Sequence, residues 1–185
     1  SIQSFDSKYD AGRRLVANDN QNFPNFTQAE NAGKNLFIAA PVFDANSSRI
    51  AGGLGCNGCH NAPEFDIDPN SGNNGVIGQA NGTNRDFTNT RAPSLRDLTR
   101  TDRRVNSPMM HTGAIQGLRA VINHYNTITV NPAQNPNLDP RLAPNGIGQK
   151  LNLTDVELNA VVSFLETLAG TNLYTDKKWS DPFIQ

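Results

Sequence analysis

The residues best suited to chemistry are two cysteines and a histidine that stand close together. The segment Gly55-Cys56-Asn57-Gly58-Cys59-His60 holds a C-x-x-C-H motif, and its two cysteines are the only two of the chain. Two thiols in this spacing add to the vinyl groups of one haem, and the adjacent histidine reaches the iron. The motif therefore predicts one covalently bound haem c, held through Cys56 and Cys59, with His60 as an axial ligand.

Two other functions of a C-x-x-C pair compete with haem attachment. A redox dithiol of the thioredoxin kind sits at a strand–helix junction of a βαβ unit, and no such pattern surrounds this motif. A structural zinc site needs four ligands, and the chain has no second cysteine pair. Haem attachment remains the favoured reading.

Composition limits the class of protein, its partners and its location. The 185 residues suffice for one domain with a real core, but only 36% are hydrophobic and 7% aromatic, so a buried cofactor would add needed apolar surface. A net charge of −1 argues against nucleic acid or an anionic membrane as partner. No apolar run is long enough for a membrane span. Proteins with C-x-x-C-H mature outside the cytoplasm, so we expect a bacterial periplasmic protein.

The first expected helix precedes the motif. Thr27 and Glu30 form a capping box, which predicts a helix from there to about Ala40. Gly33 lies inside this helix, where glycine costs stability relative to alanine, and we interpret it as the point of a close helix crossing. A tolerated surface glycine is the alternative. Residues 1–26 are expected to form a short helix and an extended lead-in.

Two further helices are expected after the motif, at residues 117–126 and, from the capping box of Thr154 and Glu157, at residues 154–170. The segments between the helices are rich in Gly, Asn and Pro. Structureless loops of such length are uncommon unless something orders them, and wrapping a haem would do so. Since no alternating strand pattern is visible, the sequence predicts an all-α fold, with loops at residues 41–55, 61 to about 108, and 127–150.

Several segments resemble one known family. Residues 91–96 read Arg-Ala-Pro-Ser-Leu-Arg, residues 108–113 read Pro-Met-Met-His-Thr-Gly, and the helix of Leu118 to Tyr125 follows. In this order they resemble the C-terminal haem domain of bacterial di-haem cytochrome c peroxidases and their MauG relatives. Residues 4–10 are similar to the interdomain segment of that family, and residues 153–170 to its last helix.

The resemblance implies a class I cytochrome c-like domain whose long irregular loops wrap around one covalently bound haem. Its parts would be a lead-in (residues 1–26), the haem domain (27–170) and a C-terminal tail (171–185). The family has a second, peroxide-reactive haem in an N-terminal domain with its own C-x-x-C-H motif, whereas this chain has a single motif and begins with Ser1. We therefore expect a fragment that relays electrons or oxidising equivalents to a missing haem, with a freestanding monohaem electron carrier as the alternative.

The second axial ligand of the iron would decide the redox behaviour. Met109, Met110, His111, His124 and Tyr125 are the candidates. The peroxidases place a methionine fourteen residues after the histidine of their H-x-G segment, and MauG uses a tyrosine there. Counting from residue 111 gives residue 125 (111 + 14), so the resemblance favours Tyr125. A methionine, His124 or an open site remain alternatives.

The resemblance assigns further residues and partners. His111 would have a structural place beside the haem, and Arg91 and Arg96 would pair with haem propionates, although solvated arginines are the alternative. Implied partners are the N-terminal haem domain, a small redox protein as electron donor, and hydrogen peroxide as substrate of the parent protein. The family binds calcium between its two domains, so calcium is expected only in the complete protein.

Overall fold

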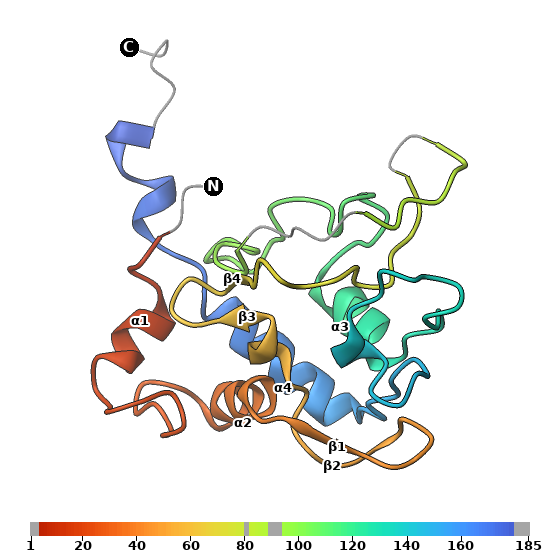
Figure 1. Ribbon diagram of the computed structural model, residues 1–185. Helices are drawn as coiled ribbons and strands as arrows, with labels where there is room; N and C mark the ends of the chain where they lie inside the picture. Colours follow the sequence, from red (N-terminus) through yellow and green to blue (C-terminus); the bar gives the residue numbers. More distant parts are fainter. Residues whose placement is uncertain (1–3, 80–81, 89–93, 180–185) are drawn as a thin grey trace.

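The computed structural model describes residues 4–79, 82–88 and 94–179 (Figure 1). Within these ranges the α-helices are α1 (Lys8–Arg13), α2 (Gln28–Ile38), α3 (Leu118–Asn126) and α4 (Asp155–Glu166). Strands β1 (Pro41–Phe43) and β2 (Arg49–Gly52) form one antiparallel hairpin, and β3 (His60–Asn61) and β4 (Asp66–Ile67) form another. Short 3₁₀ turns lie at Cys56–Gly58, Pro140–Leu142, Asn172–Tyr174 and Lys177–Trp179.

Helices α2 and α4 pack against each other in the lower half of the molecule as Figure 1 shows it. Both capping boxes form as predicted, since Thr27 caps the backbone of Glu30 and Thr154 that of Glu157. Gly33 lies at the crossing, where a Cβ atom would stand 1.9 Å from the carbonyl oxygen of Ala160. The prediction of a close helix crossing at Gly33 is therefore confirmed.

Helix α3 packs on α4 and buries Leu118 and Ile122. Its bounds confirm the predicted helix at residues 117–126. Helix α4 ends at Glu166, earlier than predicted, because Thr167 donates its backbone N–H to Phe164, three residues back, and so tightens the last turn. Among the described residues, no helix is long and apolar enough to span a membrane.

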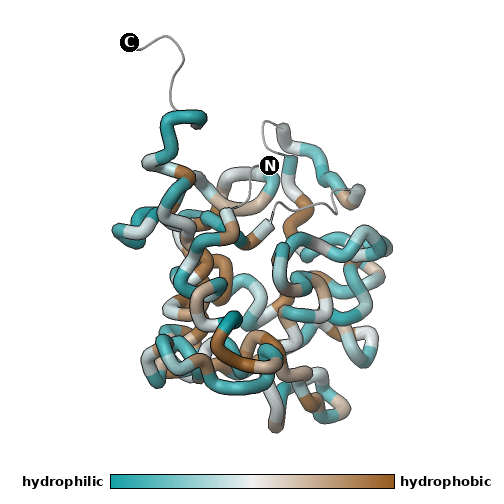
Figure 2. The backbone as a smooth tube through the Cα atoms, turned by 90° about the vertical axis from the view of Figure 1, so that its left-hand side faces the viewer, coloured by the Kyte–Doolittle hydropathy of each residue, from teal (hydrophilic) through white to brown (hydrophobic). Residues whose placement is uncertain are grey.

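An aromatic cluster fills the space between α1, α2, the β3–β4 hairpin and α4. Tyr9 meets Phe65 edge to face with ring centroids 4.9 Å apart, and Phe164 packs against both Tyr9 and Phe37. These rings are at most 2% exposed, so they form the centre of the core. In Figure 2 the hydrophobic stretches run through the interior, and many of the surrounding loops are hydrophilic.

The two hairpins were not visible in the sequence, which predicted a loop over residues 41–55. Strands β1 and β2 expose the side chains of Val42 and Ile50, so they lack the alternation of buried and exposed residues that reveals a half-buried strand. The likeness to a class I cytochrome c stays a prediction.

The segments at residues 4–10 and 167–172 are bonded to each other. The backbone N–H of Tyr9 donates to the carbonyl oxygen of Thr167 at 3.1 Å. The carboxylate of Asp6 accepts bonds from Thr171 and Asn172, and that of Asp97 accepts bonds from Ser4 and Gly170. The N-terminal segment therefore shares one core with α4 and is not a detached arm.

Candidate functional site

The C-x-x-C-H motif follows the β1–β2 hairpin and lies against the C-terminal end of α2. The backbone N–H of Leu54 donates to Leu36 at 2.7 Å, and that of Gly55 donates to Ala39 at 2.9 Å, which fixes the motif to the end of α2. Gly55 has a φ of +69°, a conformation that glycine adopts without strain. The 3₁₀ turn then brings the N–H of Cys59 to the carbonyl of Cys56 at 3.1 Å. Both thiols are thus presented by one rigid turn.

The two thiols are free and partly buried. Burial raises the pKa of Cys56 to about 12, and the neighbouring Cys59 adds to the rise. Burial also raises the pKa of Cys59. A reactive dithiol needs a thiolate at neutral pH, so these values argue against the thioredoxin-like alternative.

A zinc site finds no support in the described part of the chain. No group of three or more His, Cys, Asp or Glu side chains gathers there as a metal site would require.

The ring of His60 is oriented by a backbone carbonyl. Its Nδ1 lies 3.2 Å from the carbonyl oxygen of Phe65, at the other end of the β3–β4 turn. Burial lowers the pKa of His60, which favours the neutral imidazole. With Nδ1–H donating to Phe65, the lone pair resides on Nε2, the nitrogen that a metal would use.

Tyr125 lies on α3, far from the motif in sequence but near it in space. Burial raises the pKa of Tyr125 to about 12, and the charges of Cys56 and Cys59 contribute to that rise, so its phenol is within electrostatic reach of both sulfur atoms. Its side chain nevertheless keeps partial solvent exposure. The fold therefore brings together the cysteines and the tyrosine that the sequence nominated.

Asn74 connects several of the other candidate ligands. Its Nδ2 donates to the sulfur of Met110 at 3.2 Å, and its side chain is also a hydrogen-bond partner of Tyr125 that lowers the pKa of the phenol against the effect of burial. The Nε2 of His124 lies 2.8 Å from the backbone oxygen of Asn74. Asn74 was not nominated from the sequence, because it lies in an Asn-Asn-Gly stretch that reads as an ordinary turn.

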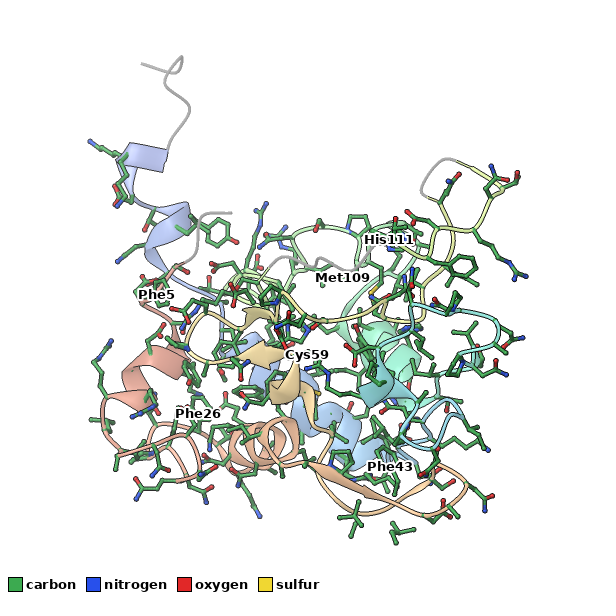
Figure 3. All side chains as sticks on the ribbon, in the orientation of Figure 1. Phe5, Phe26, Phe43, Cys59, Met109 and His111 are labelled. Atoms are coloured by element: carbon green, nitrogen blue, oxygen red, sulfur yellow. The ribbon has the colours of Figure 1, made fainter. Side chains whose placement is uncertain are left out.

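Met109 and His111 flank Met110 on the loop that Figure 3 places above Cys59. Met109 is 8% exposed and belongs to the hydrophobic core, beside Leu118 and Ile122. The Nε2 of His111 lies 2.8 Å from the carbonyl oxygen of Gly78. The structure thus gives His111 a backbone partner and gives Met109 an apolar surrounding.

Arg91 and Arg96 are the two arginines that were predicted to pair with haem propionates. Arg91 lies outside the described residues. Arg96 is buried and pairs with Asp10, while its Nε donates to the carbonyl oxygen of Pro63 at 2.6 Å. The structure therefore gives Arg96 a partner other than a propionate.

Arg141 is the charged residue that reaches the motif instead. It donates to the carbonyl oxygen of Gly58 and to Ser71, and it forms an ion pair with Asp139 at 2.7 Å. Sequence reasoning missed it because Arg141 lies in a Pro- and Asn-rich loop without a motif. It ties residues 139–142 to the turn that carries the cysteines.

These donors fit a haem c. Two free thiols lie on one turn, an imidazole has its Nδ1 engaged and its Nε2 lone pair available, and a phenol stands within electrostatic reach of both thiols. A covalent haem needs the two thiols and the imidazole. An iron with two protein ligands also needs a second donor, which the phenol can supply.

Comparison with known proteins points in the same direction. No family model matches the chain. The chain is 32% identical over 80 residues to the methylamine utilization protein MauG of Methylophilus methylotrophus. The matched segment covers 43% of this chain and 20% of that MauG. Its fold is similar to the crystal structure of a MauG-like protein associated with microbial copper homeostasis, with a TM-score of 0.63 and 25% identity over 97% of this chain.

These similarities support a place for the chain in the family of MauG and the di-haem cytochrome c peroxidases. This is a family of haem-binding oxidoreductases, and the C-x-x-C-H sequence of residues 56–60 is consistent with it. The chain spans about half the length of the solved MauG-like protein, 52%, and the curated MauG is matched over a smaller share.

Proposed function

We propose that the chain is a haem c electron-transfer domain of a di-haem oxidoreductase of the cytochrome c peroxidase and MauG type. In this proposal Cys56 and Cys59 would hold the haem through thioether bonds, and His60 and Tyr125 would supply the protein ligands of its iron. The observation that carries the proposal is the placement of the Tyr125 phenol within electrostatic reach of both cysteines. A lone C-x-x-C-H motif would not require a partly buried tyrosine on a separate helix to lie there.

The haem would supply one-electron redox chemistry. The residues of the chain would set how easily it is reduced. His60 is held neutral and oriented by Phe65, which suits it to donate Nε2 to iron. A phenolate from Tyr125 is an anionic, hard donor, and it favours the ferric over the ferrous state. This domain would therefore work at a low reduction potential and suit the sharing of oxidising equivalents.

The proposed partners follow from the family. The domain would relay electrons or oxidising equivalents to a peroxide-reactive haem of a second domain, and a small redox protein would supply the electrons. Hydrogen peroxide is the proposed substrate of the parent protein, and the periplasm its proposed location. Calcium would be bound only where both domains are present. The part of the chain we describe would then cycle between redox states but reduce peroxide poorly.

A freestanding monohaem electron carrier is the second candidate. It is favoured by the sulfur of Met110, which shares the Asn74 side chain with Tyr125 and is therefore placed near the same site. Methionine is a soft, neutral ligand that raises the reduction potential, as a carrier requires.

Haem attachment is tested by expressing the chain in a bacterial periplasm together with a cytochrome c maturation system. The protein should keep one haem per chain after denaturation, and Cys56→Ser and Cys59→Ser should each reduce covalent attachment. A matched control is Ser71→Ala, because Ser71 lies beside Arg141 at the same site but carries no thiol. A wild-type protein that loses its colour on denaturation would refute haem c binding.

The role as a relay is tested by turnover with hydrogen peroxide and a reduced donor. The purified haem-loaded chain should turn over far below about ten per second, a typical enzyme rate. Turnover at that rate would assign peroxide reduction to this domain and contradict the relay.

A further inference from the structure

We propose that Asn74 is a positioning residue that tunes the distal ligand of the haem iron by donating hydrogen bonds from its side-chain amide. This inference rests on the proposed haem site. The inference goes beyond the proposed function because it names a residue, outside the motif and the ligands, that adjusts the redox behaviour of the site.

The first support is the orientation of the amide. The Oδ1 of Asn74 accepts the backbone N–H of Val76 at 3.0 Å, which directs Nδ2 to the opposite side. There Nδ2 lies 3.2 Å from the sulfur of Met110, and the same side chain is a partner of Tyr125. An amide nitrogen can only donate, so both candidate ligand atoms face a donor.

The second support is the rigidity of the segment that carries Asn74. The neighbouring Asn73 is fully buried, its Oδ1 accepts from the side chain of Asn135 at 2.7 Å, and its backbone N–H donates to Asn137 at 2.7 Å. On the other side, the backbone oxygen of Asn74 meets the ring of His124 at 2.8 Å. A group that acts through hydrogen bonds must be held in a precise position, and these contacts fix the backbone on both sides of the Asn74 side chain.

The consequence follows from electron donation. A hydrogen bond to a ligand atom withdraws electron density from it and weakens its donation to the iron. Ferric iron gains most from a strong donor, so the Asn74 amide should raise the reduction potential relative to the same ligand without it. This holds whether the ligand is the oxygen of Tyr125 or the sulfur of Met110, because the Asn74 side chain is a hydrogen-bond partner of both residues.

The same contacts give His124 a different role. Its Nε2 is engaged by the backbone oxygen of Asn74, and its ring lies edge to face with that of Tyr125 at a centroid distance of 5.2 Å. We therefore assign His124 to the support of this segment and not to the iron.

The experiment compares the reduction potential and the ferric absorption spectrum of the haem-loaded wild type with those of two variants. Asn74→Ala removes the amide, and Asn74→Asp keeps an acceptor for Val76 but removes the donor. Both variants should have a lower potential than the wild type and a displaced ferric spectrum.

Asn70→Ala and Asn70→Asp are the matched controls. Asn70 is exposed in the same loop, and within the described residues its amide bonds to Asp68 nearby, so neither substitution should move the potential or the spectrum. The aspartate control separates the loss of the donor from the addition of a charge.

Unchanged potentials and spectra in both Asn74 variants would overturn the inference and leave the proposed function standing. Failure of both variants to fold with haem, while the Asn70 variants do so, would assign Asn74 a purely structural role and also overturn it. A wild type without covalent haem would instead refute the proposed function itself.

Discussion

Arg96 and Asp10 form a two-bond ion pair inside the protein. The Nη2 of Arg96 lies 2.8 Å from Oδ1 of Asp10, and its Nη1 lies 3.0 Å from Oδ2. The arginine side chain is 0% exposed. Its remaining donors reach the carbonyl oxygens of Pro63 and Ser4, so one guanidinium joins the N-terminal segment to the chain that follows the motif.

Removing one partner of this pair should destabilise the protein strongly. Asp10→Ala would leave the buried guanidinium of Arg96 without its counter-charge, and we expect a loss of about 3–5 kcal/mol in the free energy of unfolding. Urea denaturation of the variant and the wild type measures this loss. The control is Arg119→Ala, since the pair of Arg119 with Asp155 is exposed and should contribute no more than about 1 kcal/mol. Equal losses in the two variants would contradict the assignment.

Gly33→Ala should also destabilise the protein, although alanine is the better helix former. The added Cβ would stand 1.9 Å from the carbonyl oxygen of Ala160, which is backbone and cannot turn away, so α2 and α4 must move apart. We expect a loss of about 1–3 kcal/mol, measured by thermal or urea unfolding.

Ala32→Gly is the matched variant for this crossing. Ala32 is the exposed neighbour in the same helix, and glycine there should cost about 1 kcal/mol through helix propensity alone. A stabilised Gly33→Ala protein would show that the helices do not touch at this point.

The stability of α4 should depend on pH through Glu157. Burial raises the pKa of Glu157, but the hydrogen bonds from Thr154 and Arg49 outweigh it, so its pKa lies below the ordinary value of 4.5. A lowered pKa means that the stabilisation is present above pH 4.5 and is lost as the pH falls through the folded-state pKa.

Glu157→Gln tests this dependence, because glutamine can still complete the capping box but carries no charge. We expect the variant to be less stable than the wild type by about 1 kcal/mol at pH 7 and equally stable at pH 3. Unfolding curves at the two pH values measure the difference. A deficit that persists at pH 3 would show that the charge is not responsible.

The distal ligand is tested by a pair of substitutions in the haem-loaded protein. Tyr125→Phe keeps the ring but removes the oxygen, so the phenolate-type ferric spectrum should disappear and the reduction potential should rise. Met110→Leu should leave the phenolate spectrum in place. A thioether charge-transfer band in the wild type that survives Tyr125→Phe would refute ligation by Tyr125 and favour the electron carrier.

Local signals in the sequence predicted the helices that position the site. The capping boxes of Thr27 and Thr154 mark helix starts because a side chain and a nearby backbone N–H satisfy each other within one turn. Gly33 revealed a crossing since a missing side chain inside a helix has few other uses. The C-x-x-C-H motif predicted its own cofactor because all its parts are adjacent in the chain.

Contacts between distant residues could not be predicted in the same way. Arg96 was expected to meet a propionate, but its partner Asp10 lies 86 residues away in sequence, and nothing local links the two. Asn74 and Arg141 reach the site from Gly- and Asn-rich loops, where neither periodicity nor spacing restricts the fold. Only the assembled structure brings these groups to Met110, Tyr125 and the turn of the cysteines.

The bond from Tyr9 to Thr167 has a consequence for the order in which the protein assembles. Synthesis begins at the N-terminus, so Tyr9 must wait for Phe164 and Thr167 before the aromatic core can close. Cys56 and Cys59 emerge well before that point. Their thiols, partly buried in the finished fold, would therefore be more open during an interval of synthesis and export in which a haem can be attached.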